Sequence, residues 1–525
     1  MRLALTAITS VVIANNLFAQ SSLSGSLEIN NNFYVRDTVI GASGIPLYDH
    51  LLSGTDAWLS MIYGNADWGF SAGIRMDAFY NSNLHDPTKA FTGVGIGRIY
   101  ASKDVGKLTI TGGHIYEQFG SGLTFRAYEE RGLGIDNALL GVHLKYKLND
   151  DWSLRALTGK QKDLFRTYAP IIKGGNVEGF HRISEKVSVA PGASVVNRTM
   201  DDASMNATVT LINSYPEESR FTPHYNTYAW SVYNTLAAGP ITWSAEYAGK
   251  SDDVMATPSG DFFHGTGTVL YSTLGYARKG FAITGHVKRT ENFTFRTSPH
   301  EILLKGQINF LPPLQRQNVY RLLSRYNAAT QELAEQAFML DVIIKPSTKT
   351  TINLNSSYIN NLDGEKLFRE VYGDVQYRAS RNIKLLVGLQ VLDYNQLVYE
   401  QKGDSSLIAV TPFLEATVRL DRKKSIKTEL QYMSNEEDFG SWAYGLVEFS
   451  IAPTWSFAVS DMWNIVPKKT TDDLHYPTVF VSFTKDANRF AISYVKQVEG
   501  IVCTGGICRF EPAFSGVKFS VNSNF

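Results

Sequence analysis

The stretch NIKLLVGLQV, residues 382–391, alternates apolar side chains with other side chains at every position except Leu386. Ile383, Leu385, Val387, Leu389 and Val391 fall on one side, opposite Lys384, Gly388 and Gln390. A period of two places neighbouring side chains on opposite faces of a β-strand, so this pattern predicts a strand with one apolar face. The same alternation recurs in ITWSAEYAGK (241–250), INLNSSY (352–358) and FLEATVRL (413–420).

The connections between such strands alternate in length. Short polar turns are expected near 64–67, 103–107, 148–151, 237–240, 277–280, 345–350, 379–382, 421–425, 451–454 and 485–489, and a longer connection lies between each pair. Short turns at one end and long loops at the other are typical of outer-membrane barrels. The sequence therefore predicts an all-β fold, a large antiparallel transmembrane β-barrel of about 22 strands, within roughly 18 to 26. Its short turns would be periplasmic and its long loops extracellular, the longest at 116–137, 161–223 and 295–337.

A soluble multi-blade or sandwich protein is the alternative, because its strands would alternate in the same way. Two features favour the membrane barrel: the sidedness of the loops, and aromatic residues expected to face outward near strand ends. These aromatic residues are Trp152, Trp243, Trp442, Trp455, Tyr247 and Tyr358. An unpaired backbone group in hydrocarbon costs several kcal/mol, so such a sheet must close on itself.

The two ends of the chain agree with this location. Residues 1–20 combine Arg2, an apolar run and Ala19, which predicts a secretory signal peptide, with a buried N-terminal helix as the alternative. Residues 21–525 would then form a single barrel, and the sequence leaves no room for an N-terminal plug domain. The last strand alternates and ends on Phe525, and it resembles the signal that the outer-membrane insertion machinery reads. We expect a protein of the outer membrane of a Gram-negative bacterium, in contact with membrane lipid.

Length and charge exclude other classes. A chain of 525 residues exceeds one ordinary core, which fits several domains, a repeat array or one large closed sheet. Lys and Arg together number 50, as do Asp and Glu, so the net charge gives no support for nucleic-acid binding. An HExxH motif is absent, and strand histidines such as His143 and His286 are most simply lumen-facing polar residues. No enzyme, cofactor or metal site is expected.

The only two cysteines lie in CTGGIC, 503–508. Gly505 and Gly506 would form a two-residue hairpin turn that sets Cys503 opposite Cys508, at a separation that suits a disulfide in an extracellular loop. Free thiols or a metal site are the alternatives, although two thiolates alone leave a metal's coordination shell incomplete.

A barrel of this size has a lumen too wide for wall side chains to fill, so the long loops must narrow it. Loop 116–137 carries the candidates for a polar constriction, which are Glu117, Arg126, Glu129, Glu130, Arg131 and Asp136. A solvated outer loop tied by ordinary ion pairs is the alternative. Loop 161–223 is long enough for strands of its own, as a lid or an inserted hairpin. In 312–338, Val319, Leu322, Leu323 and Tyr326 share one helical face, which predicts a helix in or over the lumen, or one that binds a partner.

Four segments carry a resemblance to a known family: YEQFGSGLTFRAYEERGLGIDNALLGV, LPPLQRQNVYRLLSRYNAATQ, YARKGFAITGHVKRTENFTFRT and the ending GGICRFEPAFSGVKFSVNSNF. Together they resemble a family of bacterial outer-membrane barrels of about this length that has no assigned biochemical function. Relatives look more like Tyr-Pro-Tyr-Ala-Thr-Gln where this chain has residues 326–331. The resemblance implies location and fold and adds no chemistry.

Two functional classes follow. The first is a porin-like channel or transporter for a polar solute, with loops that narrow the lumen. The second is a non-conducting structural or accessory barrel of an outer-membrane export or assembly complex, in contact with other outer-membrane proteins.

Overall fold

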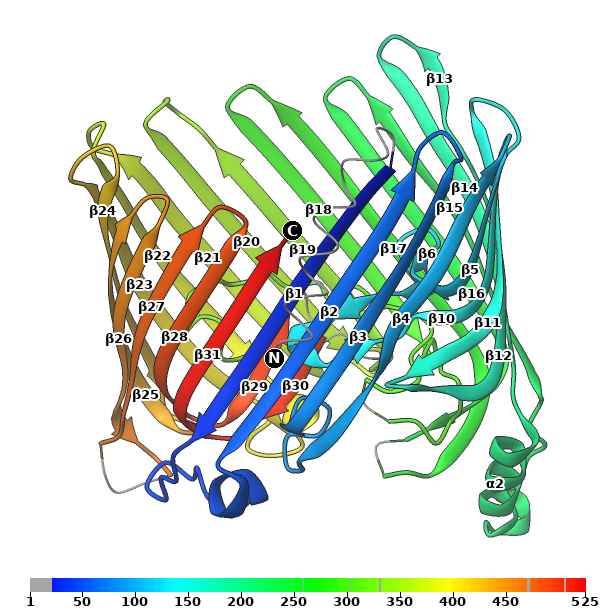
Figure 1. Ribbon diagram of the computed structural model, residues 1–525, viewed down its shortest axis with the longest axis horizontal. Helices are drawn as coiled ribbons and strands as arrows, with labels where there is room; N and C mark the ends of the chain where they lie inside the picture. The colour runs from blue at the N-terminus through cyan, green and yellow to red at the C-terminus, as the bar shows by residue number, and fades with distance from the viewer. Residues whose placement is uncertain (1–20, 258, 303, 330–331, 470–472, 505–506) are drawn as a thin grey trace.

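The chain folds as one closed antiparallel β-barrel (Figure 1). The computed structural model describes residues 21–257, 259–302, 304–329, 332–469, 473–504 and 507–525. Within these residues 24 strands form the wall, which confirms the predicted fold class and falls inside the predicted range of strand number. The expected signal peptide, 1–20, lies outside the described residues.

The wall strands pair in chain order, each with the next. The first twelve are β1 (Ser21–Tyr34), β2 (Ser53–Asn65), β3 (Phe70–Ser82), β4 (Phe91–Val105), β5 (Leu108–Ile115), β10 (Leu139–Lys147), β11 (Trp152–Asp163), β12 (Arg166–Gly179), β14 (Val187–Thr199), β15 (Asn226–Ala238), β16 (Ile241–Ala256) and β17 (Phe262–Arg278). The second twelve are β18 (Phe281–Glu291), β19 (Glu335–Ile344), β20 (Thr350–Asn361), β21 (Lys366–Arg378), β22 (Ile383–Tyr394), β23 (Leu407–Arg419), β24 (Lys424–Asn435), β25 (Gly440–Ile451), β26 (Trp455–Pro467), β27 (His475–Lys485), β28 (Asn488–Gln497) and β31 (Phe514–Asn524). Short β13 (His181–Ser184) extends the hairpin between β12 and β14.

The last strand closes the barrel by pairing with the first. β31 runs antiparallel to β1 from Ser26 opposite Asn524 to Tyr34 opposite Gly516. Beyond that register, Gly25 and Phe525 exchange two backbone hydrogen bonds, of 2.7 and 2.9 Å. No edge of the sheet is left unpaired at this junction, as a sheet in hydrocarbon requires.

The alternation in 382–391 predicts correctly which side chains face outward. On β22 the outward Val387 is 57% exposed, while the inward Gln390 is 1% exposed. Five of the six aromatic residues expected at the outer surface are exposed there. Trp442 is the exception and that expectation is wrong: it is fully buried and packs against Phe439 and Tyr476 inside the barrel.

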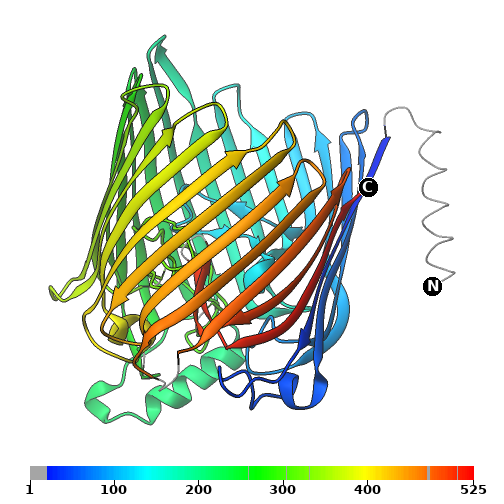
Figure 2. The same ribbon diagram turned by 90° about the vertical axis from the view of Figure 1, so that its left-hand side faces the viewer.

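Short turns and long loops lie at opposite ends of the barrel, and the C-terminus lies at the short-turn end (Figures 1 and 2). All ten predicted short turns connect consecutive strands. The single long loop predicted at 161–223 is wrong, because β12 and β14 inside it are wall strands. Only 200–225 remains as a loop there. It contains α2 (Asp202–Asn213), which lies outside the barrel at the long-loop end, and η3 (Glu217–Ser219).

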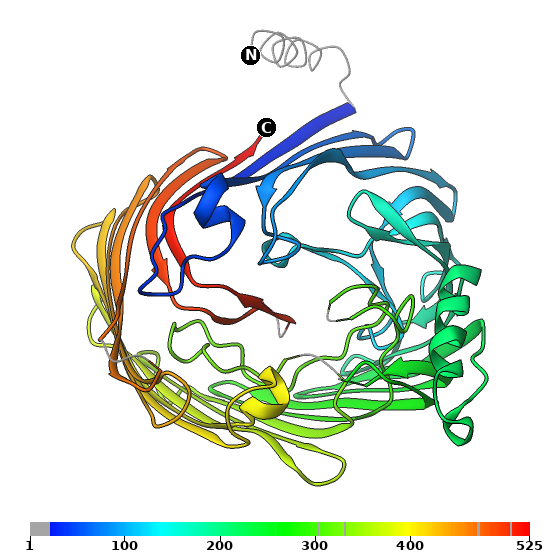
Figure 3. The same ribbon diagram turned by 90° about the horizontal axis from the view of Figure 1, so that it is seen from below.

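Several long loops fold into the lumen or across its mouth rather than away from it (Figure 3). They are 35–52 with η1 (Leu47–Leu51), 116–138, 395–406 with α3 (Gln396–Glu400), and the described parts of 292–334 and 498–513. The largest cluster of buried apolar residues joins such loops to the wall, through residues such as Leu47, Leu322 and Phe514. In the described chain, no helix is long and apolar enough to cross a membrane.

The helix predicted from the apolar residues of 312–338 is wrong. The described part of 311–334 forms turns and irregular chain, and β19 begins at Glu335. Leu322, Leu323 and Tyr326 are buried as expected, but Val319 is 88% exposed. The segment does occupy the lumen, held by contacts described below.

The cysteine hairpin forms with the predicted register, but it is not an outer hairpin. β29 (Gly500–Thr504) and β30 (Ile507–Glu511) pair with Cys503 opposite Cys508. The hairpin folds inward, where Arg509 donates a hydrogen bond to the carbonyl of Leu84 at 2.5 Å. The turn residues Gly505 and Gly506 lie outside the described residues, and the disulfide remains a prediction.

Candidate functional site

Loop 116–138 enters the lumen through two short hairpin pairings. β6 (Glu117–Gln118) pairs with β7 (Arg126–Ala127), and β8 (Glu129–Glu130) pairs with β9 (Ile135–Asp136). Each pairing encloses a tight bend. Gly122, with φ +97°, lies between β6 and β7, and Gly134, with φ +67°, lies between β8 and β9. Residues other than glycine rarely adopt such positive φ values. The single turn η2 (Arg131–Leu133) joins β8 to β9.

Arg75 is the centre of an ion-pair network that ties this loop to the wall. Its side chain, on β3, is 3% exposed and makes a bidentate pair with Asp77, with distances of 2.6 and 2.8 Å. The same guanidinium reaches the loop, where it pairs with Glu129 and, at 2.8 Å, with Asp136. Charge-assisted bidentate pairs of this kind fix geometry as well as charge.

Asp136 receives two further interactions, from Lys162 and Tyr116. Lys162 of β11 pairs with its carboxylate and also donates to the carbonyl of Gly97 at 2.6 Å. The Tyr116 hydroxyl donates to its other oxygen at 2.8 Å. Burial alone would raise the pKa of Asp136, but the adjacent Lys162 and Arg75 outweigh it and hold the pKa below its usual value. The carboxylate is therefore ionised at neutral pH.

Two further ion pairs continue the network along the wall. Arg131 pairs with Glu129 at 2.9 Å and with Glu28 of β1 at 2.8 Å. Because β1 is the strand that closes the barrel, the loop is linked to the closure seam as well as to β3.

Glu117 anchors the start of the loop on the opposite side. It pairs with Arg155 of β11 at 2.7 Å, and Arg155 pairs in turn with Glu178 of β12. His143 of β10 lies 3.3 Å from Glu117, which fits its predicted position in the lumen. Four of the six constriction candidates thus bind the wall: Glu117, Glu129, Arg131 and Asp136.

Arg126 and Glu130 differ from the other four candidates. In the described part of the chain neither makes an ion pair. The guanidinium of Arg126 lies 4.1 Å from the ring centroid of Phe310 and 4.4 Å from that of Tyr128. Burial lowers its pKa, although an arginine stays charged at neutral pH. Arg126 and Glu130 are therefore the two candidates whose charges have no ionic partner among the described residues.

A second inward segment, 293–329, packs beside the first. The amide of Arg126 donates to the carbonyl of Ile308 at 2.9 Å, and that of Phe310 donates to the carbonyl of Gly122 at 3.0 Å. Asn137 also donates to the carbonyl of Gln307 at 3.2 Å. The two segments therefore form one body inside the barrel.

Wall side chains bind the backbone of the second segment directly. Lys250 donates to the carbonyl of Thr294 at 2.6 Å, and Lys288 to that of Pro312 at 2.7 Å. Gln431 accepts from the amide of Leu322 at 2.7 Å, and Gln390 donates to the carbonyl of Leu323 at 3.3 Å. These four anchors were not among the residues predicted from the sequence. Their signal is present there, because all four are polar residues on inward-facing strand positions.

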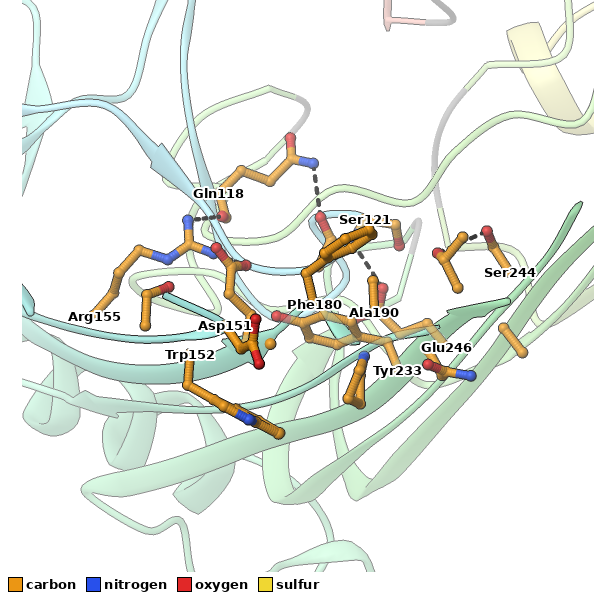
Figure 4. A pocket seen from close by; sticks show the side chains of 18 of the residues that line it. Gln118, Ser121, Asp151, Trp152, Arg155, Phe180, Ala190, Tyr233, Ser244 and Glu246 are labelled. Carbon is orange, nitrogen blue, oxygen red and sulfur yellow. Dashed lines mark hydrogen bonds and ion pairs between the residues drawn. The ribbon is translucent and has the colours of Figure 1, made fainter. Parts of the chain in front are cut away.

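A cavity of about 860 Å³ lies between the first loop and the wall (Figure 4). Gln118, Gly120 and Ser121 of the loop line it, together with strands β10 to β12 and β14 to β17 and the short turn at 149–151. The inner end is at Glu246 of β16, whose Oε2 accepts from the amide of Ser121 at 2.7 Å. The cavity thus begins at the short-turn end and stops at the inward loop.

In the described residues, no group of three or more His, Cys, Asp or Glu side chains has an arrangement that could hold a metal ion. The site consists of fixed charges, backbone anchors and one polar cavity. Such an arrangement can select and orient a polar molecule.

The chain belongs to DUF6029, a family of unknown function, whose model matches residues 1–525. This confirms the resemblance to a barrel family without an assigned biochemical function. No curated protein matches the chain.

Solved structures of similar architecture include the siderophore receptor PirA from Pseudomonas aeruginosa, 11% identical, with a TM-score of 0.42 over 96% of this chain and 80% of that one. The translocation pore of the P pilus usher PapC is 10% identical, with a TM-score of 0.44 over 96% of this chain and 99% of that one. OccK3 from P. aeruginosa is 10% identical, with a TM-score of 0.35 over 83% of this chain and 96% of that one. These likenesses assign no solute or partner to this chain.

Proposed function

We propose that this protein is a porin-like channel or transporter of the Gram-negative outer membrane, through which a polar solute passes along a lumen narrowed by its own loops. The observation that carries the proposal is the ion-pair anchoring of loop 116–138 to Arg75 and Lys162. It holds a loop with charges of both signs inside the barrel and leaves Arg126 and Glu130 without ionic partners among the described residues.

The outer surface supports the proposed location. Apolar side chains such as Val387 and Leu430 face outward along the strands, as contact with membrane lipid requires. Insertion would use the C-terminal strand that ends at Phe525. In this role the chain catalyses no reaction and needs no cofactor.

Single-channel recording in planar bilayers tests the proposal. We expect steady conductance from the purified barrel and a change in ion selectivity when Glu130→Gln or Arg126→Met removes an unpaired charge. Glu185→Gln, in the exposed short turn after β13, is the matched control and should behave as the wild type. A barrel that stays electrically silent would overturn the channel.

One observation favours the second candidate, a structural or accessory barrel. The inward segments are held by buried contacts from many strands, such as the hydrogen bond from Lys288 to the carbonyl of Pro312 at 2.7 Å, so part of the lumen is firmly filled. A silent barrel that copurifies with other outer-membrane proteins would support this role instead.

A further inference from the structure

The cavity under loop 116–138 contains a buried acceptor atom that makes no hydrogen bond of good geometry within the described residues. Glu246 is 4% exposed, and its Oε2 is satisfied by the Ser121 amide. Its Oε1 makes no hydrogen bond of good geometry within the described residues, although the hydroxyls of Ser121 and Ser231 lie beside the carboxylate. A buried polar atom without a well-formed hydrogen bond is costly and calls for a specific explanation. Because Glu246 lines the cavity, its carboxylate is the acceptor that a ligand donor at the inner end of the cavity would approach.

The charges of the cavity do not favour an ionic ligand. Its lining includes three cationic side chains, Lys145, Lys147 and Arg155, and four anionic ones, Asp150, Asp151, Glu178 and Glu246. Arg155 is already paired with Glu117 and Glu178. A strongly charged molecule would meet repulsion as well as attraction in this cavity. An uncharged molecule with many donors and acceptors would form hydrogen bonds with lining side chains of either charge.

Hydroxyl and amide groups supply the rest of the lining. The Ser244 and Thr235 hydroxyls lie 2.9 Å apart on neighbouring strands, and Gln118 reaches the cavity from the loop. A hydroxyl both donates and accepts, so this lining matches a ligand that carries hydroxyls of its own.

Tyr233 adds a fixed aromatic surface. Its ring lies across Gly192, its cross-strand partner on β14, at a position where any side chain would collide with it. Asn176 donates to the Tyr233 hydroxyl at 2.6 Å and fixes the ring from its other end. A rigid ring beside polar groups offers an apolar contact to one flat face of a ligand.

We propose that this cavity is a binding site for a short, uncharged saccharide. A saccharide combines hydroxyls for Glu246 Oε1, Ser244 and Arg155 with ring faces for Tyr233. A volume of about 860 Å³ lies within the range of small-molecule sites, roughly 300 to 1,000 Å³. The inference rests on the proposed function, because it names the class of solute that the channel would pass.

Calorimetric titration of the full-length barrel in detergent tests this binding without any need for conductance. The probes are maltotriose and N,N′,N″-triacetylchitotriose as uncharged saccharides, with trialanine as a zwitterion of another class. We expect at least one saccharide to bind and trialanine not to bind. Glu246→Gln should weaken saccharide binding by about tenfold, the cost of losing one hydrogen bond to a charged group, and Glu185→Gln should leave it unchanged.

Glu246→Gln also alters the contact with Ser121, so a second variant is needed. Ala190→Trp fills the cavity from β14 and leaves Glu246 in place, and it should abolish binding. Heat-modifiable mobility on gels checks that each variant is folded. The inference is overturned if neither saccharide binds, if only trialanine binds, or if both cavity variants bind as the wild type does.

The two proposals fail separately. A silent barrel that binds a saccharide overturns the channel and keeps the site. A conducting barrel that binds none keeps the channel and overturns the site.

Discussion

Asp136 links three parts of the molecule through one carboxylate: Arg75 on β3, Lys162 on β11 and Tyr116 on the loop itself. We expect Asp136→Asn to destabilise the inward state of loop 116–138 by about 3 kcal/mol, because it leaves two buried cations short of a partner. Hydrogen exchange of the amides in 126–137 should accelerate by about a hundredfold, since local opening governs that exchange. Asp67→Asn, in an exposed short turn, is the control. Unchanged exchange in the Asp136 variant would contradict the anchoring role.

Gly25 decides how closely the chain ends can meet. A Cβ at this position would collide with the ring of Phe525, which lies over the glycine as the two residues exchange backbone hydrogen bonds. We expect Gly25→Val to cost about 1 to 3 kcal/mol of stability through overpacking at the seam. The unfolding midpoint in urea measures this effect. Gly112→Val on β5 is the matched control, because a Cβ there would have no atom within 4 Å. Equal midpoints for the two variants would refute the expectation.

At the level of elements, Lys288 of β18 holds segment 293–329 against the wall by donating to the carbonyl of Pro312. The same ammonium is paired with Glu335 on the neighbouring wall strand β19. Lys288→Met leaves a buried carboxylate without its partner, and we expect it to cost about 3 to 5 kcal/mol of local stability. Limited proteolysis should then cut within 304–329. Adding Glu335→Leu removes the uncompensated charge and should restore part of the protection, and a double variant cut as fast as the single one would argue against this explanation.

Acid should release the first loop. The pKa of Asp136 is lowered in the folded protein from an ordinary value of 3.8, so its contribution to stability is complete above that value and is lost as the pH falls through the folded pKa. We expect protection of 126–137 from hydrogen exchange to decline below about pH 4. In Asp136→Asn the protection should be low already and should change less with pH. A wild-type loop that stays equally protected at pH 3 would rule out this dependence.

The sequence predicted the strands well where one face meets lipid, because an apolar outer face forces a strict period of two, as at 383–391. The prediction of a single long loop at 161–223 failed because one turn in this region has no recognisable turn residues. The turn between β11 and β12 consists of Leu164 and Phe165, and Leu164 takes φ +54°. An apolar pair carries no turn signal, so two strands were assigned to a loop.

The prediction of a helix near 319–326 failed because contacts with distant parts of the chain determine the conformation of this segment. Its apolar residues have helical spacing, but Gln431 and Gln390 bind the backbone of Leu322 and Leu323 directly. Contacts from strands β22 and β24, more than 60 residues further along the chain, replace the helix's own hydrogen bonds. A local pattern cannot reveal such partners. The six charged residues of loop 116–137 could be chosen from sequence, but their division into wall anchors and unpaired charges required the positions of β1, β3 and β11.

For the whole molecule, the decisive quantity is how far the inward loops narrow a 24-stranded barrel. A wall of this size encloses a lumen that its own side chains do not fill. Replacing 118–134 by two glycines should therefore raise the single-channel conductance several-fold while the wall stays closed through β1 and β31. The matched control removes α2, residues 202–213, which lies outside the barrel and should leave the conductance unchanged. If the loop deletion conducts no better than the wild type, loop 116–138 does not limit the passage, and segment 293–329 becomes the element to remove next.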